Sequence, residues 1–157
     1  MRVGIGHDTH RLERDRPLWL GGVKIEHTHG LVGHSDADVV LHALTDALLG
    51  AAALGDIGDL YPDSDPLFRN RESSFFVVDT LERLKQSGWR IVNVDIIIFA
   101  QKPKLGPQKE RIRERVAQLL STAPENISVK AKTGESVGPV GREEAISCQA
   151  VVLIDRG

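Results

Sequence analysis

All six histidines of the chain lie within its first 42 residues. Imidazole nitrogens are common metal ligands, so this grouping points to metal chemistry. Asp8 and His10 are two residues apart in a segment typical of a strand, which places both side chains on the same face. His42 lies near the start of a predicted buried helix. Three protein ligands with an open fourth position are typical of a catalytic zinc site.

The spacing alone fits a second interpretation equally well, in which Asp8 only caps a turn and His10 is exposed. Asp38 and Asp46 lie four residues before and after His42, on the same face of the predicted helix. Either carboxylate could accept a hydrogen bond from the imidazole and orient it.

The loop before this helix, residues 33–36, is a candidate phosphate site. A helix N-terminus offers free N–H groups and a positive dipole end, and His34 could donate to a phosphate oxygen. The alternative is that His34 only covers the start of the helix. Ser35 and Asp38 resemble a capping box, which predicts that the helix opens at Ser35.

A third candidate is the segment 130–135, Lys-Ala-Lys-Thr-Gly-Glu, with Arg142 further along the chain. A strand that ends in these residues could bind a phosphate and a hard cation together, with Glu135 as an oxygen ligand to Mg²⁺. Gly4-Ile5-Gly6 lacks the third glycine of a dinucleotide-binding motif, and there is no Walker lysine motif.

These segments must be positioned by alternating strands and helices. Hydrophobic periodicity and turn residues predict strands over 1–10, 90–101, 127–132 and 145–154, a Gly-Gly hairpin over 18–25, and helices over 37–54, 72–86 and 107–120. This order predicts one α/β domain over residues 1–157, an α+β-like layer sandwich with a mixed β-sheet and helices packed on one face.

Composition excludes several classes of protein. The 157 residues carry a formal net charge of −2, which argues against a dedicated nucleic-acid binder. The single cysteine, Cys148, excludes an internal disulfide and a cysteine-rich zinc site. Without a secretory signal or an apolar run of about 20 residues, the chain is expected to be soluble and cytoplasmic, with no membrane partner.

Taken together, these segments resemble the 2-C-methyl-D-erythritol 2,4-cyclodiphosphate synthase family of the non-mevalonate isoprenoid pathway. The resemblance covers essentially the whole chain. It rests on residues 4–10, 33–38, 42–47, 50–58, 61–65, 100–104, 130–135 and 141–142. The chain differs from the commonest family pattern at His7, Lys132 and Pro139.

The resemblance implies a homotrimer with active sites at subunit interfaces, and a Zn²⁺ or other divalent ion held by Asp8, His10 and His42. It implies catalytic roles for His34 and Thr133, and a Mg²⁺ or Mn²⁺ held by Glu135 that bridges the substrate diphosphate. His34 and Ser35 would meet a substrate phosphate, and the methylerythritol side would be lined by Asp56, Ile57, Gly58, Tyr61, Pro62, Asp63, Ser64 and Asp65. The neighbouring subunit would bind the cytidine through Ala100, Gln101, Lys102, Pro103, Lys104, Leu105, Gly106, Ala131, Lys132, Thr133, Gly134 and Glu135, with Arg142 as a further substrate contact.

The implied reaction is that of a cyclising phosphorus-oxygen lyase. It converts 4-diphosphocytidyl-2-C-methyl-D-erythritol 2-phosphate to the 2,4-cyclodiphosphate with release of CMP. The alternative enzyme is a zinc-dependent phosphate-ester hydrolase, which would leave the segment 130–135 without a role. A binding module with a structural zinc is a third interpretation, and it would require a fourth protein ligand.

Overall fold

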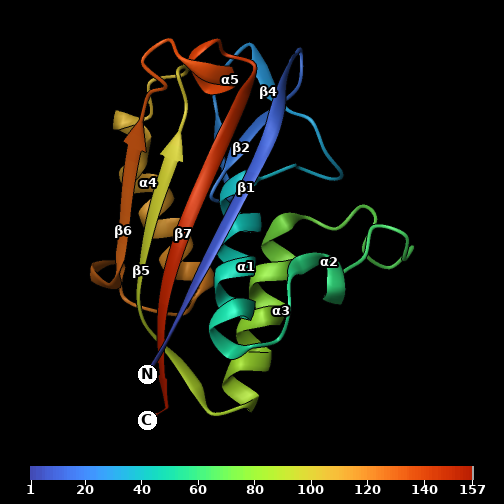
Figure 1. Cartoon of the computed structure of the whole chain (residues 1–157), viewed down its shortest axis with the longest axis vertical. Helices are drawn as coiled ribbons and strands as arrows, with labels where there is room; N and C mark the ends of the chain where they lie inside the picture. The colour runs from blue at the N-terminus through green and yellow to red at the C-terminus, as the bar shows by residue number, and fades with distance from the viewer. Residues whose placement is uncertain (157) are drawn as a thin grey trace.

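The computed structural model describes residues 1–156. A long strand opens the chain, and three short strands precede the first helix (Figure 1). The strands are β1 (Arg2–Arg14), β2 (Leu18–Leu20), β3 (Val23–Ile25), β4 (His29–Leu31), β5 (Trp89–Phe99), β6 (Ile127–Lys132) and β7 (Ala145–Arg156). The helices are α1 (Val39–Ala52), α2 (Ile57–Leu60), α3 (Ser73–Gln86), α4 (Lys109–Leu119) and α5 (Gly138–Gly141). Short 3-10 turns at Gly106–Gln108 and Pro124–Asn126 precede α4 and β6.

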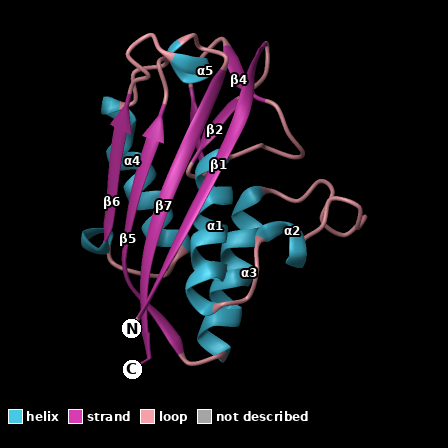
Figure 2. Ribbon diagram, viewed as in Figure 1, coloured by secondary structure: helices cyan, strands magenta, loops and turns pink. Residues whose placement is uncertain are grey.

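The main sheet has five strands in the order β4-β1-β7-β5-β6. β5 and β6 pair in parallel, whereas the other neighbours pair antiparallel, so the sheet is mixed as predicted. The helices α1, α3 and α4 lie together against one side of this sheet (Figure 2). No helix among residues 1–156 is both long enough and apolar enough to span a bilayer.

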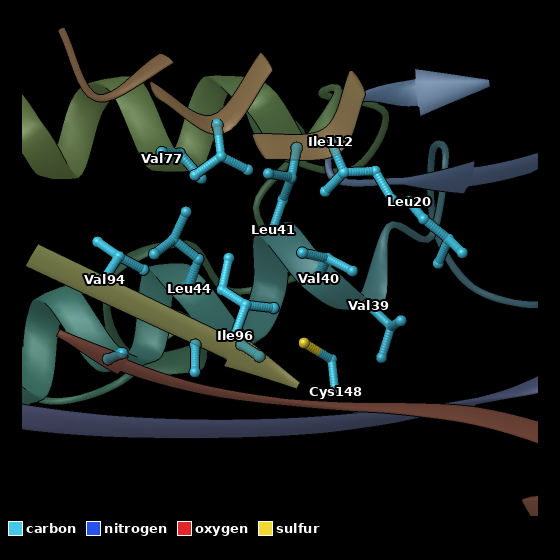
Figure 3. Close-up of a cluster of buried hydrophobic side chains, with 14 of the residues drawn as sticks. Leu20, Val39, Val40, Leu41, Leu44, Val77, Val94, Ile96, Ile112 and Cys148 are labelled. Carbon is cyan, nitrogen blue, oxygen red and sulfur yellow. The ribbon is translucent and has the colours of Figure 1, made fainter. Parts of the chain in front are cut away.

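Strand alternation explains which face is covered. Along β7, the even-numbered residues from Ile146 to Ile154 are buried, whereas Val151 is exposed. The buried row packs against α1, and Figure 3 shows Cys148 in this row beside Val39 of α1 and Ile96 of β5. On the other face of the sheet, Val3 and Ile5 of β1 are more than half exposed.

The contact between β1 and α1 depends on two glycines. A Cβ atom at Gly4 would lie 1.9 Å from the carbonyl oxygen of Ala47, and one at Gly6 would lie 1.9 Å from that of Ala43. Any larger residue would therefore overlap the helix backbone. Gly4 and Gly6 alternate with the exposed residues of β1, as the sequence predicts, and they let the helix lie directly on the strand.

The start of α1 differs from the prediction. The helix begins at Val39, and its N-cap is Asp38 rather than Ser35. The Asp38 carboxylate accepts hydrogen bonds from the N–H groups of Val40 and Leu41, both at 3.1 Å. Ser35 and Ala37 instead have left-handed backbone conformations, with φ of 58° and 50°, so the predicted capping box of Ser35 is wrong. The Asp38 carboxylate is instead used by the N-terminus of the helix and by two further backbone partners.

Those partners belong to the predicted Gly-Gly hairpin. Gly21 and Gly22 form its two-residue turn, both with positive φ, as such turns require. Their N–H groups donate to Asp38 at 2.8 and 2.6 Å. Burial raises the pKa of Asp38, which is fully buried, although these backbone hydrogen bonds oppose that effect. One carboxylate thus joins the hairpin to the start of the helix that carries His42.

Candidate active site

Asp8, His10 and His42 converge on one point. The two β1 residues follow Gly4 and Gly6 on the helix-facing side, and His42 lies in the first turn of α1. His10 Nε2 lies 2.9 Å from Asp8 Oδ2, and His42 Nδ1 lies 3.1 Å from both of these atoms. Among residues 1–156, one group of at least three acidic, histidine or cysteine side chains lies close enough together to hold a metal ion, and it is this one.

The donor set fits a divalent cation. Two imidazole nitrogens and one carboxylate oxygen face one another. All three side chains are only partly buried. The separations of about 3 Å are close to those expected around a single Zn²⁺ ion with ligand bonds of about 2.1 Å. The structure therefore contains a candidate site for a divalent metal, with the side toward the adjacent cavity left open.

The electrostatics of the free site agree with this arrangement. Burial by itself raises the pKa of Asp8, but hydrogen bonds from His10 and His42 outweigh it and hold this pKa well below its usual range. The hydrogen bond to Asp8 raises the pKa of His10, against the opposing effect of burial. The Asp8 carboxylate is thus anionic and ready to bind a cation.

The imidazoles are oriented by groups outside the cluster. His10 Nδ1 lies 2.8 Å from the carbonyl oxygen of Val32, and His42 Nε2 lies 2.9 Å from the hydroxyl of Ser73. Asp38 and Asp46 were predicted to orient His42, but both carboxylates are engaged by other groups. Asp38 is used as the N-cap of α1, and Asp46 accepts the Ile57 N–H at 2.8 Å. The four-residue spacing places both carboxylates on the same face of the helix as His42. Each of them instead accepts hydrogen bonds from backbone N–H groups.

A cavity of about 240 Å³ adjoins the metal cluster. His42 lines it, as do seven other residues that the sequence predicted to contact metal or substrate: Asp8, His10, His34, Ile57, Gly58, Tyr61 and Asp63. Gly33 of the predicted phosphate loop and Asp46 also line the cavity, and the lining residues that the sequence did not single out are Phe68, Arg71 and Phe76. Ser35, Asp56, Pro62, Ser64 and Asp65 do not line it, and their contacts with substrate stay predictions.

Local structure explains how the cavity walls are held. Asp56 is the N-cap of α2 and forms a reciprocal capping box with Asp59, while Asp46 of α1 holds the first N–H of α2. Together they place Ile57 and Gly58 at the cavity. Across it, His34 Nε2 lies 3.7 Å from Asp63 Oδ2, so the loop before α1 faces the segment after α2.

Tyr61 lines the cavity and is anchored to α3. Its hydroxyl donates to Asp79 at 2.7 Å and lies 3.0 Å from the hydroxyl of Thr80, both on α3. Its ring packs within 5.4 Å of the ring centroids of Phe68 and Phe76. The hydroxyl therefore anchors the segment after α2 to α3, and the ring supplies an apolar wall.

Most of the residues predicted to bind cytidine line a second, larger cavity of about 710 Å³ at the ends of β5 and β6. It is lined by Ala100, Gln101, Lys102, Pro103, Lys104, Leu105, Gly106, Ala131, Lys132 and Thr133, with His27, Pro107 and Lys109 as residues the sequence did not single out. Among residues 1–156, none lines both cavities.

Gly134 and Glu135 follow the lining residue Thr133 in the chain, but neither they nor Arg142 line the second cavity. Thr133 Oγ1 donates to Glu135 Oε1 at 2.9 Å, and Gln101 Oε1 accepts the Gly134 N–H at 3.2 Å. Arg142 is exposed and donates to Glu144. Glu135 is not part of the Asp8–His10–His42 cluster, so any cation that it holds occupies a separate position.

Comparison with known proteins gives the same picture. The sequence model of the YgbB family matches residues 1–155. The chain is 51% identical over 156 residues to the 2-C-methyl-D-erythritol 2,4-cyclodiphosphate synthase of Syntrophomonas wolfei, covering 99% of each chain. It is 47% identical to the bifunctional enzyme IspD/IspF of Erythrobacter litoralis, covering 99% of this chain but 40% of that one. A solved structure of 2C-methyl-D-erythritol-2,4-cyclodiphosphate synthase in its CDP-bound form superposes with a TM-score of 0.92 at 37% identity, covering 98% of this chain and 100% of that one.

Proposed function

This chain belongs to the YgbB family, and we propose that it converts 4-diphosphocytidyl-2-C-methyl-D-erythritol 2-phosphate to 2-C-methyl-D-erythritol 2,4-cyclodiphosphate with release of CMP. The observation that carries this proposal is the convergence of Asp8, His10 and His42 within 3.1 Å beside a cavity that His34 also lines. The relatives from Syntrophomonas wolfei and Bordetella avium are named as synthases, and nothing in the site favours the hydrolase alternative.

The reaction is intramolecular. An oxygen of the 2-phosphate attacks the β-phosphorus, the new P–O bond closes the ring, and the bond from the β-phosphorus to the CMP oxygen breaks. The attacking oxygen is already anionic, so the reaction needs no strong base. The main barrier is the approach of two negatively charged phosphates in line, and holding them in position removes much of it.

A Zn²⁺ or similar ion held by Asp8, His10 and His42 would supply positive charge to the phosphates when bound. A Mg²⁺ or Mn²⁺ at Glu135 would serve the diphosphate in the same way. The chain contributes the rest of the site. His34 is exposed and lines the cavity, so its ring N–H can donate to a phosphate oxygen there. Thr133 can do so from the second cavity. Such donors stabilise charge that moves during the reaction.

We infer that a complete site needs two subunits of a homotrimer. The metal cavity and the cavity predicted to bind cytidine share no lining residue, although one substrate must reach both. The sheet face opposite the helices also carries exposed apolar residues: Val3, Ile5 and Val151. Subunits that packed through this face would remove these side chains from water. A cytoplasmic location remains a prediction from the sequence.

The test is to measure metal content and CMP release for the wild type and for His42→Ala. The wild type should bind about one Zn²⁺ per chain in this three-ligand site and form a cyclic product, visible by ³¹P NMR. His42→Ala removes one ligand, so it should lose both zinc and cyclase activity while the oligomer persists. Normal turnover by His42→Ala would refute the metal assignment. A linear monophosphate or diphosphate product from the wild type would refute the cyclase assignment.

A further inference from the structure

Ser73 is a buried polar residue next to His42. It is the first residue of α3, and only 1% of it is exposed. A buried hydroxyl is costly unless it is hydrogen-bonded. Ser73 satisfies this requirement with two side chains, because its Oγ lies 2.9 Å from His42 Nε2 and donates a short hydrogen bond to Asp36 Oδ1. The three side chains form a continuous line from the metal cluster to the loop before α1.

The donor and acceptor roles along this line follow from the metal site. His42 Nδ1 faces Asp8 and His10, so it must present a lone pair there to bind a cation. The single proton of the neutral ring is then on Nε2. This N–H can donate only to Ser73 Oγ, whose own O–H is free to donate to the Asp36 carboxylate.

Asp36 is itself held firmly by α3. Its Oδ2 accepts the backbone N–H of Ser73 at 3.2 Å. It lies between Ser35 and Ala37, which both have positive φ, a conformation unfavourable for residues other than glycine. The hydrogen bonds to Ser73 therefore help to keep the loop in this shape. The same loop carries His34 at the wall of the metal cavity.

We propose that Ser73 and Asp36 are positioning residues that fix the Nε2–H tautomer and the orientation of His42, and so strengthen divalent-metal binding at Asp8, His10 and His42. A negative carboxylate at the far end of the line stabilises the polarised imidazole of a metal-bound histidine. The line also couples the metal ligand to the loop that carries His34. This inference rests on the metal site of the proposed function, and it does not depend on which reaction the site performs.

The experiment measures the affinity of the purified full chain for Co²⁺ and Zn²⁺, without substrate. Co²⁺ binding is followed by visible absorption, and Zn²⁺ binding by competition with a chelator. Ser73→Ala and Asp36→Asn should each weaken binding, by about tenfold to a hundredfold for loss of an outer hydrogen-bond partner. The Co²⁺ spectrum of Ser73→Ala should also change, because the ring is no longer held in one orientation.

Two controls separate this role from general damage to α3. Ser74→Ala makes the same change one residue along, where the hydroxyl contacts only Glu72 at 3.5 Å. Thr80→Val removes a different buried hydroxyl of α3, one that contacts Tyr61. Ser74→Ala should behave as the wild type. Thr80→Val should lower the melting temperature but leave metal affinity within about twofold, because distant sites act independently.

The outcomes are distinct. If the wild type binds neither ion, the metal site and this inference both fail. If the wild type binds and both Ser73→Ala and Asp36→Asn bind equally well, the metal site stands and the inference fails. The double variant should lose little more than Ser73→Ala alone, because one break interrupts the line, whereas additive losses would overturn it. If Ser73→Ala does not fold, Asp36→Asn decides: weaker binding supports the inference and unchanged binding overturns it.

Discussion

At the scale of single residues, Asp8 favours the protonated form of His10 when no cation is present. Asp8 remains anionic, and its hydrogen bond to His10 raises the pKa of that imidazole. A proton on His10 and a metal ion at the cluster compete for the same Nε2 lone pair. The carboxylate that attracts the metal therefore also makes the neighbouring ligand harder to deprotonate.

Metal binding should consequently depend on pH in a defined direction. Because the pKa of His10 in the free protein lies above its usual value, the proton must be displaced at every pH below that raised pKa. Zinc affinity should fall by about tenfold for each pH unit below it, one proton being released per ion, and level off above it. Chelator competition between pH 5.5 and 8.5 would measure this. An affinity that stays constant across the range would contradict the assignment of His10 as a ligand.

Residue spacing predicted the metal ligands but not what orients them. Asp8 and His10 share a strand face, and alternation along a strand is a strict geometric rule. Ser73 lies 31 residues from His42, and a serine at the start of a helix has many ordinary roles. The error over Asp38 and Asp46 has a related cause. Spacing along a helix gives a direction, but it does not show that backbone N–H groups of the hairpin and of α2 engage those carboxylates.

At the scale of elements, the site depends on the close contact of α1 with β1. His42 reaches Asp8 and His10 only because Gly4 and Gly6 let the helix backbone lie against the strand. The Gly-x-Gly pattern, which is too short for a dinucleotide motif, thus has a packing role. The sequence predicted the strands and the main helices. It missed the short elements β4, α2 and α5, whose few residues carry too little periodicity to detect.

Gly6→Ala should separate the metal ligands. Its Cβ would overlap the carbonyl of Ala43, next to His42, so the helix must move. We expect a loss of about 2–3 kcal/mol in the free energy of unfolding, as for an overpacked core, together with weaker zinc binding. Gly4→Ala should cost similar stability but affect zinc less, because it displaces α1 around Ala47 and Ala51, further from His42. Denaturant unfolding and zinc titration would measure both effects.

Gly50→Ala is the matched control within the same pair of elements. Its Cβ would meet only the Ile5 carbonyl, at 3.9 Å, which is ordinary contact. A glycine replaced by alanine within a helix should raise stability by about 0.5–1 kcal/mol. Zinc affinity should not change. If Gly6→Ala behaved like Gly50→Ala, close packing would not be what brings the ligands together.

At the scale of the whole molecule, the two cavities determine what must assemble. Each cavity is lined by a different part of the predicted substrate contacts, and no described residue lines both cavities. A single chain could satisfy the phosphates or the cytidine but would leave the other end of the substrate in water. In the proposed homotrimer, one chain's metal cavity would meet its neighbour's second cavity, and the exposed Val3 and Ile5 would provide an apolar surface for that contact.

Subunit mixing tests this arrangement directly. His42→Ala disables the metal cavity. Gly106→Trp should fill the second cavity without disturbing the fold, because a Cβ there meets nothing within 4 Å. Each variant alone should be inactive and trimeric by light scattering. The two variants are then unfolded together in equal amounts and refolded. A site is intact only where the undamaged metal cavity of a Gly106→Trp chain meets the undamaged second cavity of a His42→Ala chain. Random assembly makes that about one quarter of all sites, so about a quarter of wild-type activity should return.

The contrary result is equally clear. If each site lay within one chain, every chain in the mixture would still carry one defect, and no activity would return at any ratio. Varying the ratio adds a further check, because recovery should peak at equal amounts and fall toward zero at either extreme. Mixing the two folded variants without unfolding should give activity only as fast as subunits exchange. Recovery therefore reports on the contact between chains rather than on either cavity alone.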